Sequence, residues 1–222
     1  MSGLINILIA DDHRIVREGV KQVLADAADL RVIAEAHSGP DVITKVAQLE
    51  AAGTALDVVL LDIALPERDG LDVLQHLRKH SPGLPVLMLS TYPEKQYAVR
   101  CLKLGAAGYL NKSADADDMI AAVRKVAAGG RYVSAATAEA LAGAIAAPVK
   151  GSASPDALSH REHQVFRLLV TGHSVSEIGA QLGLAANTVS TYRARILEKT
   201  GAKNDVALAL YAERLATTGP AR

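Results

Sequence analysis

VVLLDIALPERDGLDVL, residues 58–74, is the stretch of this sequence that decides the fold. Its first four residues are apolar and include two valines, a pattern typical of a strand covered on both faces. The apolar run stops at Asp62, and Pro66 with Asp69-Gly70 indicates a tight loop before the next amphipathic segment. Open α/β sheets bind ligands at the carboxyl ends of their strands, which makes Asp62 a candidate for chemistry. Loop solvation or helix capping is the simpler alternative for one isolated carboxylate.

A strand followed by a helix recurs five times between Ile5 and Ala128. This alternation predicts a parallel sheet covered by helices on both faces, and right-handed crossovers favour a flavodoxin-like, five-stranded, doubly wound α/β fold. We expect strands at Ile5–Ala10, Arg31–Ala36, Asp57–Asp62, Pro85–Ser90 and Gly108–Asn111, and helices at His13–Ala27, Pro40–Ala52, Leu71–His80, Glu94–Leu104 and Asp115–Ala128.

Polar side chains stand at the ends of four of these strands. Parallel strands share one carboxyl edge, so the side chains are expected to form one pocket. Crowded carboxylates are unfavourable unless a cation joins them, and Mg²⁺, which takes carboxylate, water and phosphate oxygens, suits such a pocket best. One carboxylate would then attack a phosphoryl group while the metal and an ammonium neutralise its oxygens. The residues are Asp11, Asp12, Asp62 (the nucleophile), Ser90, Thr91 and Lys112 (the ammonium).

Charge is unevenly placed along the 222 residues, although 24 Lys and Arg balance 24 Asp and Glu. Residues 1–128 carry 14 basic against 17 acidic side chains, and residues 158–222 carry 8 against 5. This asymmetry fits a cation or phosphate site followed by a module that binds a polyanion. The single cysteine, Cys101, leaves no disulfide framework, and no apolar run approaches membrane-spanning length. We therefore expect a cytoplasmic protein without a membrane partner.

The sequence changes character after residue 128. Gly129-Gly130 is typical of a helix end, Ser134–Ala147 has the Ala-rich composition of a short helix, and PVKGSASPD at 148–156 is typical of a flexible tether. We predict one domain at residues 1–128, a linker with a short helix at 129–157, and a second domain at 158–222.

The second domain shows only helical periodicity. Ser159 with Glu162, and Ser174 with Glu177, have the spacing of capping boxes that open two helices, and residues 183–185 form a glycine turn before a helix at 187–200. This pattern predicts a helix-turn-helix whose second helix enters the DNA major groove; a small helical bundle with a solvated basic face is the alternative. The expected DNA contacts are Thr188, Ser190, Thr191, Arg193, Arg195, Lys199 and Lys203.

These motifs resemble a known family. Asp11-Asp12, the D-x-x-x-P-x-x-D-G pattern of Asp62–Gly70, VLMLS at 86–90 and GYLNKS at 108–113 are similar to the receiver domain of bacterial response regulators, over residues 4–128. LSHREHQVFRLL, SVSEIGAQLGL and NTVSTYRARILEKTGAKN resemble the LuxR-type helix-turn-helix, over residues 158–216. The combination is that of the NarL/FixJ class of two-component response regulators.

The resemblance implies a transcription regulator that accepts a phosphoryl group from a cognate histidine kinase and then controls sequence-specific binding to double-stranded DNA, as a homodimer when phosphorylated. It implies no enzymatic activity beyond the protein's own phosphorylation and dephosphorylation. The implied residues are Asp62 as phosphoacceptor, Asp11, Asp12, Asp62 and the Ala64 backbone carbonyl as Mg²⁺ ligands, Ser90, Thr91 and Lys112 around the phosphoryl group, and Tyr109 as the aromatic that moves inward on activation.

Two rival functions and two departures from the family pattern stay open. A DNA-binding regulator could use the first domain only to dimerise, independently of phosphorylation. A phosphatase with an Asp nucleophile would show D-x-D, whereas this chain has Asp62-Ile63-Ala64. Ser190 stands where many relatives carry Lys, and Ala185 stands where a Ser usually caps the recognition helix, so Asn187 is the expected cap instead.

Overall fold

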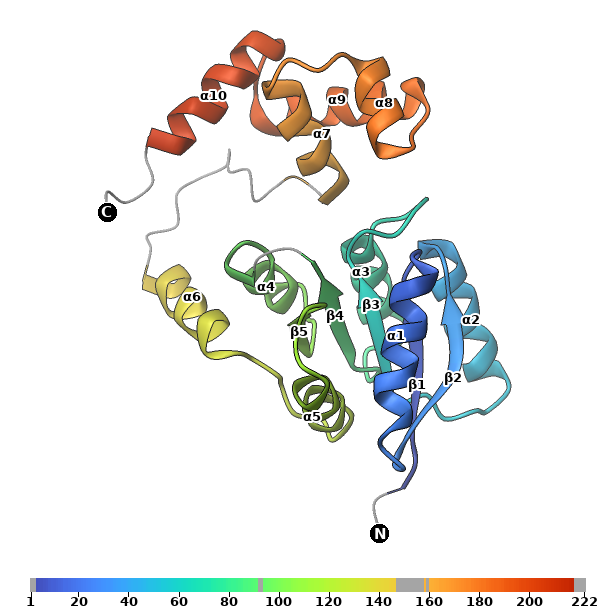
Figure 1. Cartoon of the computed structure of the whole chain (residues 1–222). Helices are drawn as coiled ribbons and strands as arrows, with labels where there is room; N and C mark the ends of the chain where they lie inside the picture. Colours follow the sequence, from blue (N-terminus) through green and yellow to red (C-terminus); the bar gives the residue numbers. More distant parts are fainter. Residues whose placement is uncertain (1–2, 92–93, 147–157, 159, 218–222) are drawn as a thin grey trace. The chain divides into compact units, whose positions relative to one another are not determined.

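The computed structural model describes residues 3–91, 94–146, 158 and 160–217. Contacts within the chain divide it into two compact units, Met1–Pro148 and Val149–Arg222, and each is described by itself (Figure 1). The division falls inside the segment predicted as a linker. The predicted tether at 148–156 and the capping residue Ser159 lie outside the described residues.

The first unit contains every strand and helix that the sequence predicts for it. Their ends differ from the predicted ends by no more than two residues, because propensity marks the middle of an element better than its last turn. The elements are β1 (Ile5–Ala10), α1 (Arg14–Ala25), β2 (Leu30–Ala36), α2 (Gly39–Ala51), β3 (Val58–Asp62), α3 (Gly70–His80), β4 (Val86–Ser90), α4 (Glu94–Lys103), β5 (Gly108–Asn111), α5 (Ala116–Ala127) and α6 (Ala135–Ala146).

The five strands form one parallel sheet in the order β2-β1-β3-β4-β5. Alternate residues of β1 face opposite sides: Leu8 joins the core under α2, α3 and α4, whereas Ile7 and Ile9 join the core under α1 and α5. Figure 1 shows this sandwich, with α1 and α5 on one side of the sheet and α3 and α4 on the other. The predicted doubly wound, flavodoxin-like sheet is confirmed, and it brings β1, β3, β4 and β5 into neighbouring positions.

Helix α6 follows the last strand–helix pair and packs against α4. Its N-terminus is capped by Ser134, whose Oγ accepts a hydrogen bond from the Thr137 backbone N–H at 3.1 Å. Thr137 itself is buried. The short helix predicted within the linker therefore exists, and its contacts make it part of the first unit.

The second unit is helical and encloses a core of its own. Helices α7 (His160–Val170), α8 (Val175–Leu182), α9 (Ala186–Thr200) and α10 (Asp205–Thr217) surround a core that includes Phe166, Ile178 and Ile196. The capping box of Ser174 and Glu177 opens α8 as predicted. Helix α10 was not predicted, because its apolar residues show no clear helical period. Within the described residues, no helix is both long and apolar enough to span a membrane.

The α8–α9 turn differs in detail from the prediction. Gly183 ends α8 in the left-handed conformation, with φ +66°, as its position in the turn requires. The N-cap of α9 is Ala185, which offers no side-chain hydrogen bond, and Asn187 lies inside the first turn. The expectation that Asn187 caps this helix is therefore wrong, because the helix begins one residue earlier than predicted.

Candidate functional site

The carboxyl ends of β1, β3 and β5 bring three charged side chains into one pocket. Asp11 and Asp62 are buried, with 1% and 2% of their surface exposed. The Lys112 ammonium lies 2.5 Å from Asp11 Oδ2 and 2.8 Å from Asp62 Oδ2. The strand order explains this meeting, since β1 and β3 are neighbours and Lys112 follows β5 on the same edge. The sequence prediction that these ends converge agrees with this geometry.

The electrostatic balance of the pocket is negative. Among the described residues, Lys112 is the ion-pair partner of both Asp11 Oδ2 and Asp62 Oδ2, and neither oxygen accepts another hydrogen bond of good geometry. Burial raises the pKa of Asp62, and the charge of Asp11 raises it further against the opposing ammonium and the Ala64 backbone N–H. Burial works to lower the pKa of Lys112, but Asp62 and Asp11 outweigh it and raise this pKa. One ammonium thus faces more carboxylate charge than it can neutralise.

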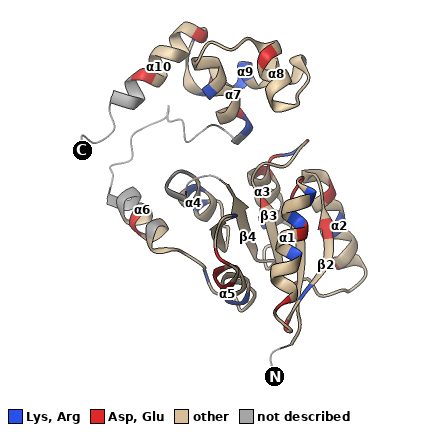
Figure 2. Cartoon of the chain, in the orientation of Figure 1, with Lys and Arg blue, Asp and Glu red and all other residues tan. Residues whose placement is uncertain are grey.

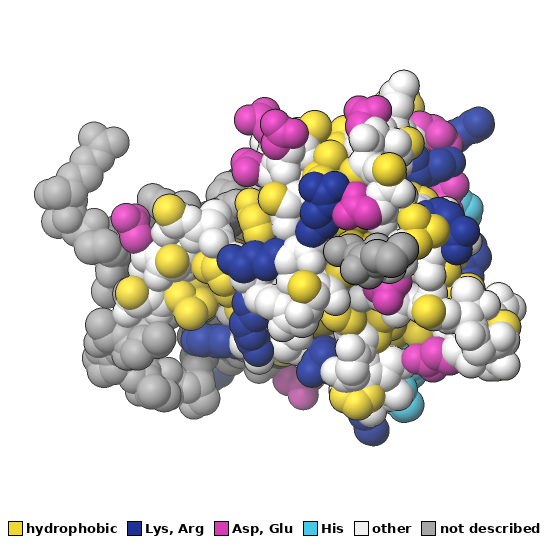
Figure 3. Space-filling view, turned by 90° about the horizontal axis from the view of Figure 1, so that it is seen from below, with side chains coloured by type: hydrophobic (Ala, Val, Ile, Leu, Met, Phe, Trp, Pro, Cys, Tyr) yellow, Lys and Arg dark blue, Asp and Glu magenta, His cyan; other side chains and the backbone are white. Residues whose placement is uncertain are grey.

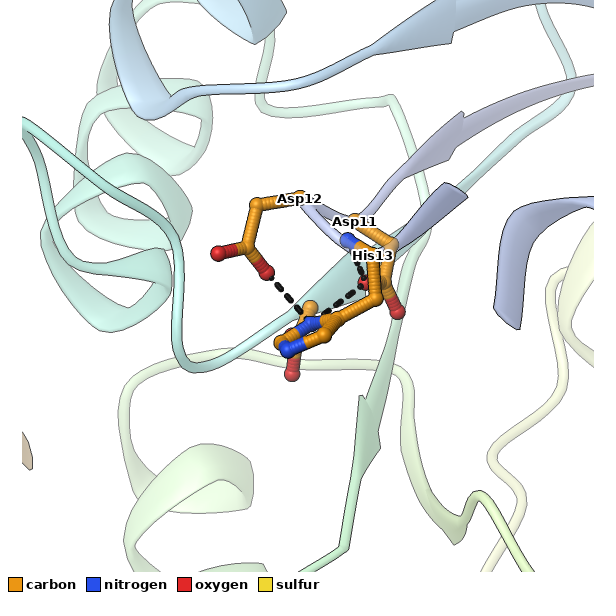
Figure 4. Close-up of side chains that lie close together, drawn as sticks. Asp11, Asp12 and His13 are labelled. Carbon is orange, nitrogen blue, oxygen red and sulfur yellow. Dashed lines mark hydrogen bonds and ion pairs between the residues drawn. The ribbon is translucent and has the colours of Figure 1, made fainter. Parts of the chain in front are cut away.

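Asp12 and His13 complete the cluster at its rim. Oxygens of Asp11, Asp12 and Asp62 and a ring nitrogen of His13 all lie within 4.8 Å of one another. Figure 4 shows three of these residues, Asp11, Asp12 and His13, with the His13 ring turned towards the two carboxylates. The Asp12 and His13 side chains are 32% and 65% exposed, so this side of the cluster is open to solvent. Oxygen ligands around excess negative charge fit a divalent cation. The sequence prediction missed His13, although its place directly after Asp11-Asp12 was a signal.

The remaining predicted pocket residues occupy different depths. Ser90 at the end of β4 is fully buried, and its neighbour Thr91 is exposed. Ala64 is half-buried in the β3–α3 loop, where its carbonyl as a metal ligand stays a prediction. Tyr109 is 1% exposed and belongs to the core under α2, α3 and α4. The aromatic ring that the resemblance expects to move inward is inward in this structure.

The loop after Asp62 folds back onto its own strand. The Gly70 backbone N–H donates to the Ile63 carbonyl at 2.9 Å, and a Cβ on Gly70 would lie 2.0 Å from the Asp62 carbonyl oxygen. Only glycine allows this approach, which accounts for the D-G pair that starts α3. The Asp69 carboxylate caps the helix by accepting the Leu71 N–H at 2.8 Å. The loop therefore has little freedom around the carboxylate that it follows.

Arg17 of α1 holds the backbone of Asp11 in place, and the sequence prediction also missed it. Its guanidinium is buried and donates to the Asp11 backbone carbonyl at 2.7 Å and to Glu35 Oε2 at 3.2 Å. The Arg17 side chain is 8% exposed. An arginine within an amphipathic helix carries no sequence signal of its own, because most such residues face solvent.

The end of the first unit where the strands begin has a different surface. Figure 3 shows this face, with Lys and Arg interspersed among Asp, Glu and hydrophobic side chains. One pair links the start of β2 to α5 with two hydrogen bonds, Arg124 Nε to Asp29 at 2.8 Å and Arg124 Nη2 to Asp29 at 2.6 Å. In this pair one base meets one acid, in contrast to the pocket, where one ammonium faces two carboxylates.

The second unit presents α9 as the candidate DNA-contacting helix, with Lys and Arg along it (Figure 2). Val189 and Ile196 anchor one side of α9 in the core. Thr191 Oγ1 donates to the Asn187 carbonyl at 3.0 Å. The predicted contacts that are exposed on or beyond α9 are Thr188, Ser190, Thr191, Arg195, Lys199 and Lys203.

Two of the predicted DNA contacts already have partners within the unit. Arg193 Nε lies 2.8 and 3.0 Å from the two Asp205 oxygens, which ties α9 to α10. Lys199 Nζ lies 2.6 Å from Oε2 of the buried Glu162, which ties α9 to α7. These cations hold the helices together, and their contact with DNA stays a prediction. Spacing along one helix could not reveal partners on two others.

Comparison with known families agrees with both halves of the chain. Residues 7–124 match the response regulator receiver domain, and residues 156–212 match the bacterial regulatory proteins of the luxR family. The chain therefore belongs to the response regulators that join a receiver to a LuxR-type helix-turn-helix, the NarL/FixJ class.

Individual relatives share this architecture over nearly their whole length. The response regulator GacA of Pseudomonas aeruginosa is 36% identical over 95% of this chain and 96% of its own. The crystal structure of ChrA, a response regulator of a heme-sensing two-component system, is 31% identical, with a TM-score of 0.52 over 96% of this chain and 98% of that one. RcsB of Salmonella enterica serovar Typhimurium, bound to promoter P1flhDC with the phosphomimetic BeF3⁻, shares the fold at 24% identity and TM-score 0.58, over 95% and 98% of the chains.

Proposed function

We propose that Asp62 accepts a phosphoryl group from a cognate histidine kinase and that this transfer controls DNA binding by the second unit. The observation that carries the proposal is the buried Asp62 carboxylate held 2.8 Å from the Lys112 ammonium beside Asp11. A carboxylate oxygen attacks phosphorus, a P–O bond forms, and the bond to the donor breaks. Before transfer the Lys112 ammonium pairs with the Asp62 carboxylate. After transfer it would pair with the phosphoryl oxygens instead.

The other pocket residues have supporting roles in this proposal. Asp11, Asp12, Asp62 and the Ala64 carbonyl would hold Mg²⁺, which when bound neutralises charge on the phosphoryl oxygens. The buried oxygens of Asp11 and Asp62 that accept no well-directed hydrogen bond support such a site. The hydroxyls of Ser90 and Thr91 would orient the phosphoryl group. Outside this self-modification the protein has no enzymatic role in our proposal.

The output of the proposed switch is binding to double-stranded DNA by a homodimer. The exposed residues of α9 would enter the major groove, and two protomers would read half-sites about one helical turn apart. The DNA-bound structure of RcsB, which shares this fold, supports this assignment. A DNA-binding function also supports a cytoplasmic location, where promoters and kinase are both accessible.

Acetyl phosphate labelling tests the proposed acceptor. In the presence of Mg²⁺ we expect peptide mapping to place the phosphoryl group on Asp62, and Asp62→Asn to abolish the label while the chain stays folded. The matched control is Asp72→Asn, which changes an exposed carboxylate on α3 and leaves labelling unchanged.

Footprinting on genomic DNA tests the coupling. The phosphorylated protein should protect sites that the Asp62→Asn protein does not protect. Equal protection by both proteins would favour the rival function, a regulator that binds DNA independently of phosphorylation. Turnover of a generic phosphoester would instead revive the phosphatase alternative.

A further inference from the structure

His13 stands at the start of α1, where a side chain normally caps the helix. It is the N-cap residue of α1, where Ser, Thr, Asp or Asn normally accepts a hydrogen bond from the helix, but its side chain makes no capping bond. The ring instead points to the carboxylates, with Nδ1 2.7 Å from Asp12 Oδ1 and 3.4 Å from Asp11 Oδ1 (Figure 4). The His13 side chain thus leaves the first turn of α1 uncapped and places a ring nitrogen in the pocket.

The backbone fixes this arrangement. The His13 backbone N–H donates to Asp11 Oδ1 at 2.8 Å, so the same carboxylate is held by main chain and approached by the ring. The His13 carbonyl accepts the Arg17 N–H at 3.1 Å, and the Arg17 guanidinium donates to the Asp11 carbonyl at 2.7 Å. These bonds fix the main chain of both residues at the first turn of α1, so the His13 side chain begins next to the Asp11 and Asp12 carboxylates.

The distances match those between ligands of one ion. Two atoms bound to a cation at about 2.1 Å on adjacent octahedral positions lie roughly 3.0 Å apart, and atoms on opposite positions lie about 4.2 Å apart. The two Nδ1–oxygen distances, 2.7 and 3.4 Å, lie on either side of the first value. The whole set, with Asp62, lies within 4.8 Å.

Independent evidence for a ligand comes from the buried side of the cluster. Among the described residues, the two buried oxygens Asp11 Oδ2 and Asp62 Oδ2 share one cation, the Lys112 ammonium at 2.5 and 2.8 Å, and accept no other well-directed hydrogen bond. Buried carboxylates in this state require positive charge.

We propose that His13 Nδ1 is a nitrogen ligand of the pocket cation and that it shifts the preference of the pocket from Mg²⁺ towards Mn²⁺ and Co²⁺. This inference rests on the proposed function only in requiring that the acidic pocket holds a divalent cation. Mg²⁺ takes oxygen ligands and gains little from an imidazole, whereas affinity for nitrogen-containing sites rises from Mn²⁺ to Co²⁺.

Equilibrium titration of the full chain with Mg²⁺, Mn²⁺ and Co²⁺ tests the proposal without any measurement of phosphorylation. His13→Gln should lower Co²⁺ affinity by roughly tenfold or more, Mn²⁺ affinity by less, and Mg²⁺ affinity by less than about twofold. The visible absorption of bound Co²⁺ should also change, because a nitrogen ligand is replaced by oxygen.

A second pair of imidazoles, on α3, would compete for transition metals in these titrations. His76 and His80 on α3 stack with ring centroids 4.1 Å apart and stand one helical turn from each other. All titrations are therefore made in a His76→Gln, His80→Gln background. His13→Asn is the second variant, because Asn caps helices well and keeps α1 stable if the Gln variant does not fold.

The outcomes separate this inference from the proposed function. Equal losses for the three cations, or none, would overturn the role of His13 while leaving the cation site in place. Asp12→Asn should weaken all three cations, and failure of the parent chain to bind any of them would overturn both the cation site and the inference.

Discussion

The two units use charge in opposite ways. In the second unit two ion pairs join helices, each of one acid with one base: the buried Glu162 pairs with Lys199, and Asp205 pairs with Arg193. In the pocket of the first unit, Asp11 and Asp62 share the single ammonium of Lys112, and Asp12 adds a third carboxylate. Balanced pairs fasten helices together. The cluster in the pocket has excess negative charge, which favours binding of a cation. The ratio of acids to bases therefore distinguishes structural ion pairs from the functional site.

Removing the ammonium should have the largest effect on stability. Lys112→Met leaves two buried carboxylates without a counter-charge, and we expect it to lower the free energy of unfolding by about 3–5 kcal/mol at neutral pH. Burial already raises the pKa of Asp62, and loss of the ammonium raises it further. The loss of stability is therefore largest above the folded-state pKa of Asp62 and shrinks as pH falls through it, because Asp62 becomes neutral.

Urea unfolding in EDTA at several pH values measures this effect. Lys45→Met is the matched control, since its pair with Asp41 is about one-third exposed on each side and is worth under about 1 kcal/mol. An equal loss of stability in both variants would show that Lys112 contributes no more to stability than a partly exposed ion pair does.

Neutralising one acid in each unit should change stability in opposite directions. Asp62→Asn relieves excess charge and should raise the free energy of unfolding, because burial and the Asp11 charge hold the pKa of Asp62 above its usual range. Glu162→Gln removes the charged partner of Lys199 from a buried position and should lower it by about 1–3 kcal/mol. Thermal unfolding in EDTA gives both signs, and the same sign for both variants would break the comparison.

Within α9, the comparison predicts different losses for two arginines. Arg195 is exposed and has no ion pair among the described residues, so Arg195→Gln should weaken DNA binding and reduce the slope of log K against log salt by about 0.9. Arg193→Gln breaks the pair with Asp205. The Arg193 and Asp205 side chains are 36% and 43% exposed, so the loss should lower the free energy of unfolding by about 0.2–1 kcal/mol.

DNA-binding titrations at three salt concentrations, with unfolding measured on the same samples, separate the two effects. A larger change of salt slope for Arg193→Gln than for Arg195→Gln would mean that Arg193 leaves Asp205 to contact phosphate.

The smallest expected effect lies in the loop after Asp62. Glu67 has φ +63°, a left-handed conformation that is unfavourable for a residue with a side chain. Glu67 is exposed, so its side chain has no packing role to lose. Glu67→Gly should therefore raise the free energy of unfolding by up to about 1 kcal/mol, reduced by the greater freedom of glycine in the unfolded chain. Glu18→Gly, in the regular α1 helix, should instead lower it by about 1 kcal/mol.

The sheet edge was predictable because strand ends are visible in sequence. Apolar runs that stop at Asp11, Asp62 and Ser90 leave polar side chains on one edge, and a parallel sheet has only one carboxyl edge. Lys112 follows by the same rule after β5. The pattern therefore predicted that Asp11, Asp12, Asp62 and Lys112 lie together, whereas contacts of Ser90 and Thr91 with a phosphoryl group stay a prediction.

Other parts of the site depend on packing between helices, which spacing along one helix does not show. Arg17 was missed because its burial depends on its contacts with the Asp11 carbonyl and with Glu35 of β2, which lie on other elements. The partners of Arg193 and Lys199 lie on α10 and α7, far along the chain. His13 was missed because the resemblance assigned the neighbouring acids and left the third residue of the run unused.

The Mg²⁺ dependence of unfolding in each unit tests the central claim most directly. Cys101 is the only cysteine, is buried in the first unit, and has a pKa raised to about 12 by burial, so thiol labelling reports the opening of that unit. Hydrogen exchange of α9 amides reports the second unit in the same sample. If the pocket has excess negative charge, Mg²⁺ should slow thiol labelling by raising the free energy of opening by RT ln(1 + [Mg²⁺]/Kd). Mg²⁺ should not change hydrogen exchange in α9. It should also not change thiol labelling in Asp62→Asn. Equal protection of both units, or of wild type and Asp62→Asn, would contradict the account.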